Sequence, residues 1–61
     1  MTGAELKRQV LLRVKFEVGP VTEILDRWVV MYPKGFKFGP SAVQAAVRAV
    51  TREMTALGKK S

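Results

Sequence analysis

One segment near the N-terminus constrains the fold more than any other part of the chain. In the segment from Gln9 to Val18, QVLLRVKFEV, apolar residues occupy every second position. These apolar residues are Val10, Leu12, Val14, Phe16 and Val18. A β-strand points successive side chains to opposite faces, so the segment would have one apolar face and one mostly polar, basic face. Valine and phenylalanine also favour half-buried strands. We therefore predict a strand over residues 9–18.

A helix that begins at the N-terminus is the alternative interpretation of this region. Thr2 and Glu5 have the spacing of a capping box, the pair of side chains that satisfies free N–H groups at a helix start. Residues 5–9 are good helix formers, and Gly19 with Pro20 would end such a helix. The chain would then be an all-α mini-domain of three helices.

The small size of the chain bears on its assembly. Its 61 residues suffice for one domain. A domain of this size buries only about 60% of the surface of its unfolded chain, so a monomer is marginally stable without a cross-link. The sequence contains no Cys, which excludes disulfides. Because one strand does not make a sheet, we expect an α+β fold in an intertwined homodimer.

Two amphipathic helices are predicted after the strand. Pro20 suits a first helical turn, and apolar residues at helical spacing then predict a helix over residues 20–32. Pro and Gly at both ends of residues 33–40 predict a loop. A stripe that includes Val43, Val47 and Val50 predicts a second helix over residues 41–57. The domain would span residues 9–58, between a flexible basic arm at 1–8 and a basic tail at 59–61.

The predicted loop carries two phenylalanines, and two interpretations of them stay open. Phe36 and Phe38 lie two residues apart with Lys37 between them. Both rings could enter the hydrophobic core while Lys37 points into solvent. Alternatively, the rings could stack on nucleic-acid bases while Lys34 and Lys37 contact phosphates.

The charge balance favours a polyanionic partner. Eleven Lys and Arg residues against five Asp and Glu give a net charge of +6. A field of this sign attracts nucleic acid, the commonest polyanion. The chain has no apolar run of the length that a signal peptide or a membrane span requires. We therefore expect a cytoplasmic protein without a membrane partner.

The sequence argues against enzymatic chemistry. His and Cys are both absent, so the usual acid–base and nucleophile pairs cannot form. The five carboxylates are scattered, and no glycine-rich phosphate loop is present. We expect no catalytic residue, no metal site and no cofactor.

The order of strand, Pro-started helix, loop and amphipathic helix over residues 9–57 resembles the ribbon-helix-helix family of DNA-binding domains. The second helix carries Val43, Ala46, Val47 and Val50, which look like the family's apolar-x-x-Ala-apolar-x-x-apolar run. The resemblance implies that two chains pair their strands and insert the outward face into the major groove. It also implies that N–H groups at the start of the second helix bind a phosphate, although Pro40 removes one donor beside Ser41.

These arguments together predict a dimeric DNA-binding regulator or accessory factor, or a binder of another nucleic acid. The outward strand face would present Gln9, Leu11, Arg13 and Lys15, whose side chains suit base edges and the thymine methyl group. Further contacts, mostly to phosphates, would come from Lys7, Arg8, Lys34, Lys37 and Ser41. The alternative function is a small interaction protein that binds and modulates a larger protein partner, for instance by adding its strand to a sheet.

Overall fold

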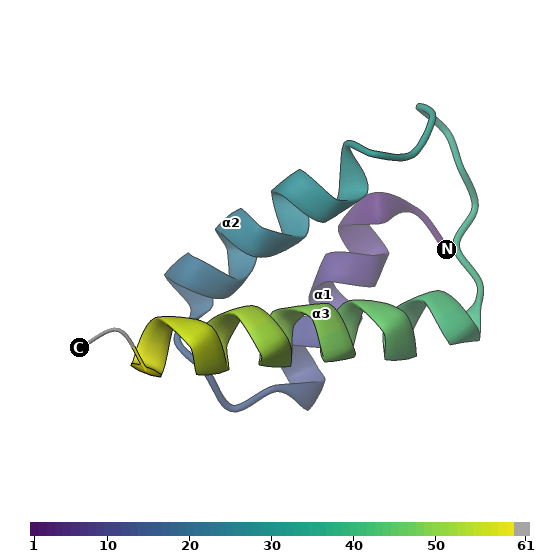
Figure 1. Ribbon diagram of the computed structural model, residues 1–61. Helices are drawn as coiled ribbons and strands as arrows, with labels where there is room; N and C mark the ends of the chain where they lie inside the picture. The colour runs from purple at the N-terminus through teal and green to yellow at the C-terminus, as the bar shows by residue number, and fades with distance from the viewer. Residues whose placement is uncertain (60–61) are drawn as a thin grey trace.

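The N-terminal segment begins with a helix cap. In the computed structural model, which describes residues 1–59, α1 spans Gly3–Arg13 (Figure 1). The hydroxyl of Thr2 accepts a hydrogen bond from the amide of Glu5 at 3.3 Å, as the capping-box spacing indicates. Glu5 in the first turn and Arg13 in the last turn complement the helix dipole.

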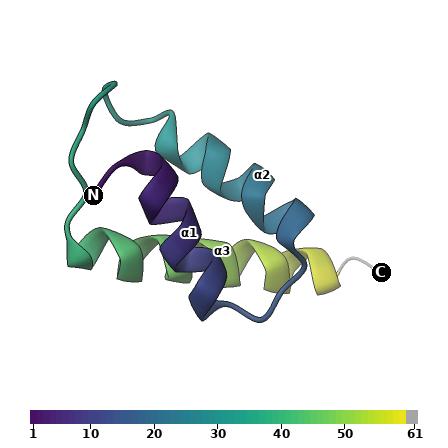
Figure 2. The ribbon, with the colours of Figure 1, turned by 180° about the vertical axis from the view of Figure 1, so that it is seen from behind.

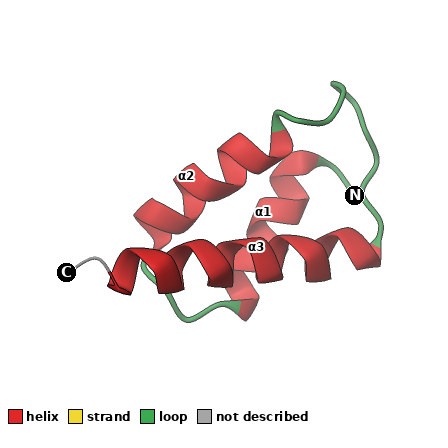
Figure 3. Ribbon diagram, in the orientation of Figure 1, coloured by secondary structure: helices red, strands yellow, loops and turns green. Residues whose placement is uncertain are grey.

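The prediction of a strand over residues 9–18, and with it the α+β fold, is therefore wrong. Residues 1–59 form three helices and no strand (Figure 3), which matches the all-helical alternative. Leu6 and Val10, four residues apart, are fully buried on one face of α1, whereas Leu12 of the alternating set is 73% exposed. The helical spacing outweighs the alternation because the other two helices cover that face. The ribbon that the family resemblance implies is absent from these residues.

The second and third helices follow from their apolar periodicity. Helix α2 spans Val18–Val29 and buries Val21, Ile24 and Leu25. One further turn beyond it is closed by a hydrogen bond from the amide of Tyr32 to the carbonyl of Val29 at 3.0 Å. Helix α3 spans Pro40–Lys59, and its proline stands in the first turn, where a missing N–H costs no helical bond.

The three helices enclose one core within a single chain. Helices α2 and α3 run in opposite directions and diverge toward their connecting loop, while α1 crosses them (Figures 1 and 2). The buried side chains are all apolar: Leu6, Val10, Val21, Ile24, Leu25, Phe38, Val43, Ala46 and Val50. The unpaired strand that suggested dimerisation does not form, so that argument no longer applies. The homodimer stays a prediction.

Two exposed ion pairs and one partly buried backbone pairing connect the elements. Lys7 of α1 donates to Asp26 of α2 at 2.7 Å, and Arg27 of α2 donates to Glu53 of α3 at 3.2 Å. Two backbone hydrogen bonds hold the α2–α3 loop against the N-terminal segment. The amino group of Met1 donates to the carbonyl of Phe38 at 2.7 Å, and the amide of Phe38 donates back at 2.8 Å.

Candidate nucleic-acid interface and an adjoining aromatic cleft

The solvent-facing side of α3 is a continuous polar stripe. At 3.6 residues per turn, positions 41, 44, 48, 52 and 55 lie on the side opposite the buried Val43 and Val50. The residues at these positions are Ser41, Gln44, Arg48, Arg52 and Thr55, and all five are exposed. We call this stripe the α3 outer face. With 20 residues, α3 is about 30 Å long and is the longest of the three described helices.

The charge of the α3 outer face is entirely positive. Arg48 and Arg52 form no ion pair within the described part of the chain. The only acidic residue of α3 is Glu53, and its carboxylate accepts from Arg27 of α2, to one side of the stripe. Charges of alternating sign along a helix face indicate a solvent-exposed helix with salt bridges along its surface. This stripe instead combines two guanidinium groups with amide and hydroxyl groups, a set suited to phosphates and base edges.

The structure separates the residues that we predicted along a strand face. On α1, Gln9 and Arg13 lie one turn apart, but Leu11 packs against the core on another side. Lys15 follows the helix in the α1–α2 connection and is exposed. Successive outward positions of a strand are about 200° apart on a helix, which is why these four side chains do not share a face.

The remaining predicted residues fall into three places. Lys7 is paired with Asp26, while Arg8 is exposed and unpaired among the described residues of α1. Lys34 and Lys37 are both exposed in the α2–α3 loop. Ser41 is the one predicted residue that lies on the α3 outer face.

Four aromatic rings gather where α2 and α3 diverge. Tyr32 lies at the centre, with its ring centroid 5.0 Å from those of Trp28, Phe36 and Phe38. Phe38 is 4% exposed and meets both Tyr32 and Phe36 edge to face. Of the two interpretations of these phenylalanines, Phe38 therefore belongs to the core, whereas Phe36 remains 42% exposed.

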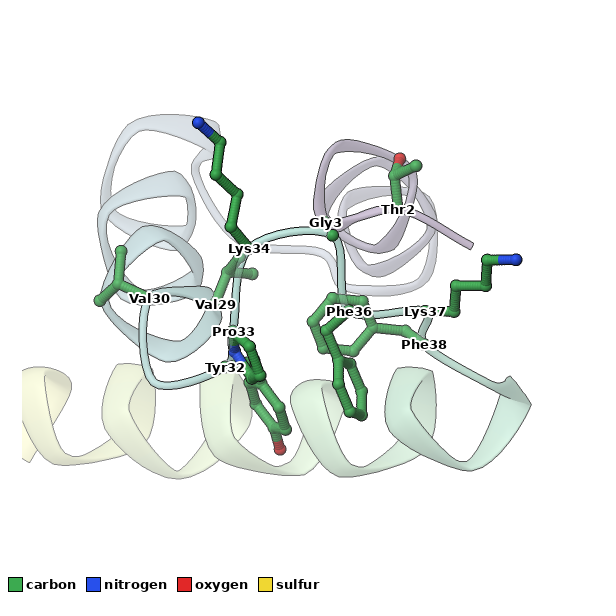
Figure 4. A pocket seen from close by; sticks show the side chains of 11 residues that line it. Thr2, Gly3, Val29, Val30, Tyr32, Pro33, Lys34, Phe36, Lys37 and Phe38 are labelled. Carbon is green, nitrogen blue, oxygen red and sulfur yellow. The ribbon is translucent and has the colours of Figure 1, made fainter.

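A cleft of about 720 Å³ adjoins this cluster on the side of the α2–α3 loop. Its apolar wall consists of Val29, Val30, Tyr32, Pro33, Phe36 and Phe38 (Figure 4). Thr2 and Gly3 complete it from the start of α1, and Lys34, Gly35 and Lys37 complete it from the loop. We call this feature the aromatic cleft. The lining contains no carboxylate, and its two charged side chains are both lysines.

The sequence-based prediction of contact residues omits four residues of the α3 outer face: Gln44, Arg48, Arg52 and Thr55. The sequence does contain the information to find them, because the helical periodicity that predicts the buried side of this helix also defines its solvent-facing side. A strand over residues 9–18 instead places the candidate contacts on residues 9–15. The aromatic cleft had a partial signal in Phe36, Lys34 and Lys37, but its wall depends on contacts between α1, α2 and the loop.

Comparisons with known proteins identify no relative of this chain. No model of a protein family, no curated protein and no solved structure matches the chain. Within residues 1–59, acidic side chains form no cluster that could hold a metal ion. No helix of this part of the chain is long and apolar enough to cross a membrane.

Proposed function

We propose that this protein binds double-stranded DNA and inserts the α3 outer face into the major groove. The major groove of B-form DNA is wide enough for an α-helix, whereas the deep, narrow groove of A-form RNA is not. The observation that carries the proposal is the carboxylate-free stripe from Ser41 to Thr55. Arg48 and Arg52 would contact phosphates or guanine edges, and Gln44 would contact adenine.

The rest of the surface supports association with a polyanion. The net charge is +6, and the two ion pairs neutralise Lys7 and Arg27. The described basic side chains that remain without a carboxylate partner are Arg8, Arg13, Lys15, Lys34, Lys37, Arg48 and Arg52. Such an excess raises the rate at which a protein meets DNA and adds binding that does not depend on sequence.

The test is a titration of fluorescein-labelled random duplex, followed by fluorescence anisotropy across a series of salt concentrations. We expect the logarithm of the association constant to fall linearly with the logarithm of salt concentration. Arg48→Ala combined with Arg52→Ala should weaken binding and reduce the steepness of this line by about 1.8, because two phosphate contacts are lost. No binding by the wild-type protein at micromolar concentration and low salt would refute the proposal.

A control variant distinguishes direct contact of α3 with DNA from the effect of net charge on DNA affinity. Arg8→Ala combined with Arg13→Ala removes the same charge from exposed sites on α1. This control should retain most of the affinity and most of the salt dependence. Equal losses in the two double variants would show that net charge alone drives binding and that α3 is not the contact surface.

A small interaction protein is the second candidate function. Strand addition no longer supports it, since the described residues contain no strand. It rests instead on exposed apolar side chains at the connection between α1 and α2: Leu12 is 73% exposed and Val18 is 63% exposed. Exposed apolar surface of this kind marks protein contacts when it is contiguous. The duplex titration distinguishes the two functions.

A further inference from the structure

We propose that the aromatic cleft binds an amphiphilic carboxylate, a single-chain molecule with an apolar body and one negatively charged end. This site is separate from the α3 outer face, and it does not depend on DNA binding. The cleft lies between the start of α1, the end of α2 and the loop that follows α2 (Figure 4).

The volume and lining of the cleft indicate the apolar part of the ligand. A volume of about 720 Å³ lies within the range of small-molecule sites, roughly 300–1,000 Å³. Val29, Val30, Pro33 and Phe36 provide aliphatic and aromatic surface. The exposed fractions of Val30 (77%) and Phe36 (42%) show that part of this wall still faces water. A ligand that covers these side chains gains the free energy of burying apolar area.

The charged side chains around the cleft indicate that the polar end of the ligand is negatively charged. Lys34 and Lys37 line the cleft, both are exposed, and neither has a carboxylate partner among the described residues. Their side chains extend outward from the loop in different directions (Figure 4), and a flexible lysine stem lets each ammonium group reach an anion at the mouth. No lining residue is acidic, so a cationic ligand would meet repulsion and gain no ion pair.

The local backbone keeps this wall in place without the ligand. The amide of Phe36 donates to the carbonyl of Pro33 at 3.0 Å and closes a turn in which Gly35 has a φ of +82°. Gly is favoured at this position because φ is positive there. Beyond the turn, the paired hydrogen bonds between Met1 and Phe38 attach the loop to the N-terminal segment. The cleft is therefore formed before any ligand arrives, which lowers the cost of binding.

The experiment uses dodecanoate as the probe, below its critical micelle concentration, with backbone amide chemical shifts as the readout. We expect saturable changes at Val30, Gly35 and Phe36, and none at Arg48 or Arg52. Acetate has the charge without the chain, and dodecyltrimethylammonium has the chain with the opposite charge. Both should bind at least about tenfold more weakly than dodecanoate.

Variants separate the contribution of the apolar wall to dodecanoate binding from that of the two lysines. Val30→Asp places a carboxylate in the apolar wall at an exposed position, so no buried contact is lost and dodecanoate affinity should fall roughly tenfold or more. Val18→Asp is its matched control, because Val18 is a similarly exposed valine at the start of α2 whereas Val30 follows the end of that helix, and this variant should bind as wild type. Lys34→Gln with Lys37→Gln should weaken binding by roughly a factor of ten, whereas Arg8→Ala with Arg13→Ala should not.

Three results would overturn the inference. One is equal binding of dodecanoate and dodecyltrimethylammonium, which would show that charge plays no part. Another is a set of shifts centred on Leu12 and Val18, which would place the chain on the other exposed apolar residues. The third is equal affinity of the Val30→Asp and Val18→Asp variants, which would exclude the cleft as the binding site.

Discussion

Gly3 and Val29 are in contact at the point where α1 meets the end of α2. A Cβ atom at Gly3 would lie 2.9 Å from Cγ1 of Val29, closer than carbon atoms approach in folded proteins. It would also lie 3.9 Å from Cε2 of Phe38, which is ordinary contact. The side chain of Val29 is branched at Cβ and has few alternative rotamers with which to withdraw. The absence of a side chain at Gly3 therefore sets how closely the two helices approach.

We expect Gly3→Ala to lower the free energy of unfolding by about 1 kcal/mol. Overpacking costs about 1–3 kcal/mol, and the better helix propensity of alanine offsets up to about 1 kcal/mol of this. Urea denaturation followed by the fluorescence of Trp28, the only tryptophan, measures the change. Gly19→Ala in α2 is the control, because an added Cβ there would meet no side chain or distant backbone atom within 4 Å. If both variants are stabilised, α1 and α2 can separate at no cost.

Gly35→Ala should also destabilise the fold, for a different reason. The φ of Gly35 is +82°, a conformation that costs an L-residue roughly 1–2 kcal/mol. Gly39→Ala offers a comparison in the same loop, since Gly39 has no positive φ and no atom near its added Cβ. That variant should be neutral or slightly stabilised. Thermal unfolding by circular dichroism compares the two, and identical midpoints would contradict the prediction.

The two phenylalanines of the loop should differ in their effect on stability. Phe38 is 4% exposed, so Phe38→Ala should lower the free energy of unfolding by about 3 kcal/mol or more. A domain this small has a total stability of about 3–5 kcal/mol, so most molecules of this variant would be unfolded. Phe38→Leu is a milder variant that keeps the loss measurable. Phe36→Ala, at a 42% exposed ring, should cost about 1 kcal/mol. A larger loss for Phe36→Ala than for Phe38→Leu would reverse the assignment of the core residue.

The ion pair between Lys7 and Asp26 should contribute little to stability. Their Nζ and Oδ1 atoms are 2.7 Å apart, but the two side chains are 33% and 54% exposed. Pairs this accessible contribute about 0.2–1 kcal/mol, and salt weakens them. A double-mutant cycle with Lys7→Ala and Asp26→Ala, at low and high salt, isolates the coupling energy. Coupling that is larger and independent of salt would indicate that the pair is shielded from water.

The sequence predicts an element correctly where its apolar residues fit the helical spacing and not the alternation of a strand. Helices α2 and α3 are of this kind. The segment from Gln9 to Val18 fits both patterns, because Val10 and Val14 fit a strand and also continue the helical spacing from Leu6. Contacts with α2 and α3 decide between helix and strand for this segment, and the sequence of the segment itself does not reveal those contacts. The helical fold also leaves two apolar residues of the alternating set exposed, Leu12 on α1 and Phe16 in the α1–α2 connection, and the sequence of this segment alone does not reveal that cost.

The candidate sites were predictable to different degrees. The loop lysines Lys34 and Lys37 were singled out from the sequence together with Phe36. Arg48 and Arg52 could have been found from the same helical projection that predicts their buried neighbours. The cleft itself could not be predicted, because its wall joins Gly3 to Val29 across separate helices.

The connectivity of the helices has a consequence for how fast the chain folds. Residues 14–17 connect α1 to α2 and residues 30–39 connect α2 to α3, and α1 packs on both of the other helices. Small helical domains fold in microseconds to milliseconds, faster than domains built on distant strand pairings. The pairing of Met1 with Phe38 is the contact most separated in sequence among the backbone bonds between elements, and it can form late. We therefore expect the wall of the aromatic cleft, which this pairing holds, to form after the three helices have packed.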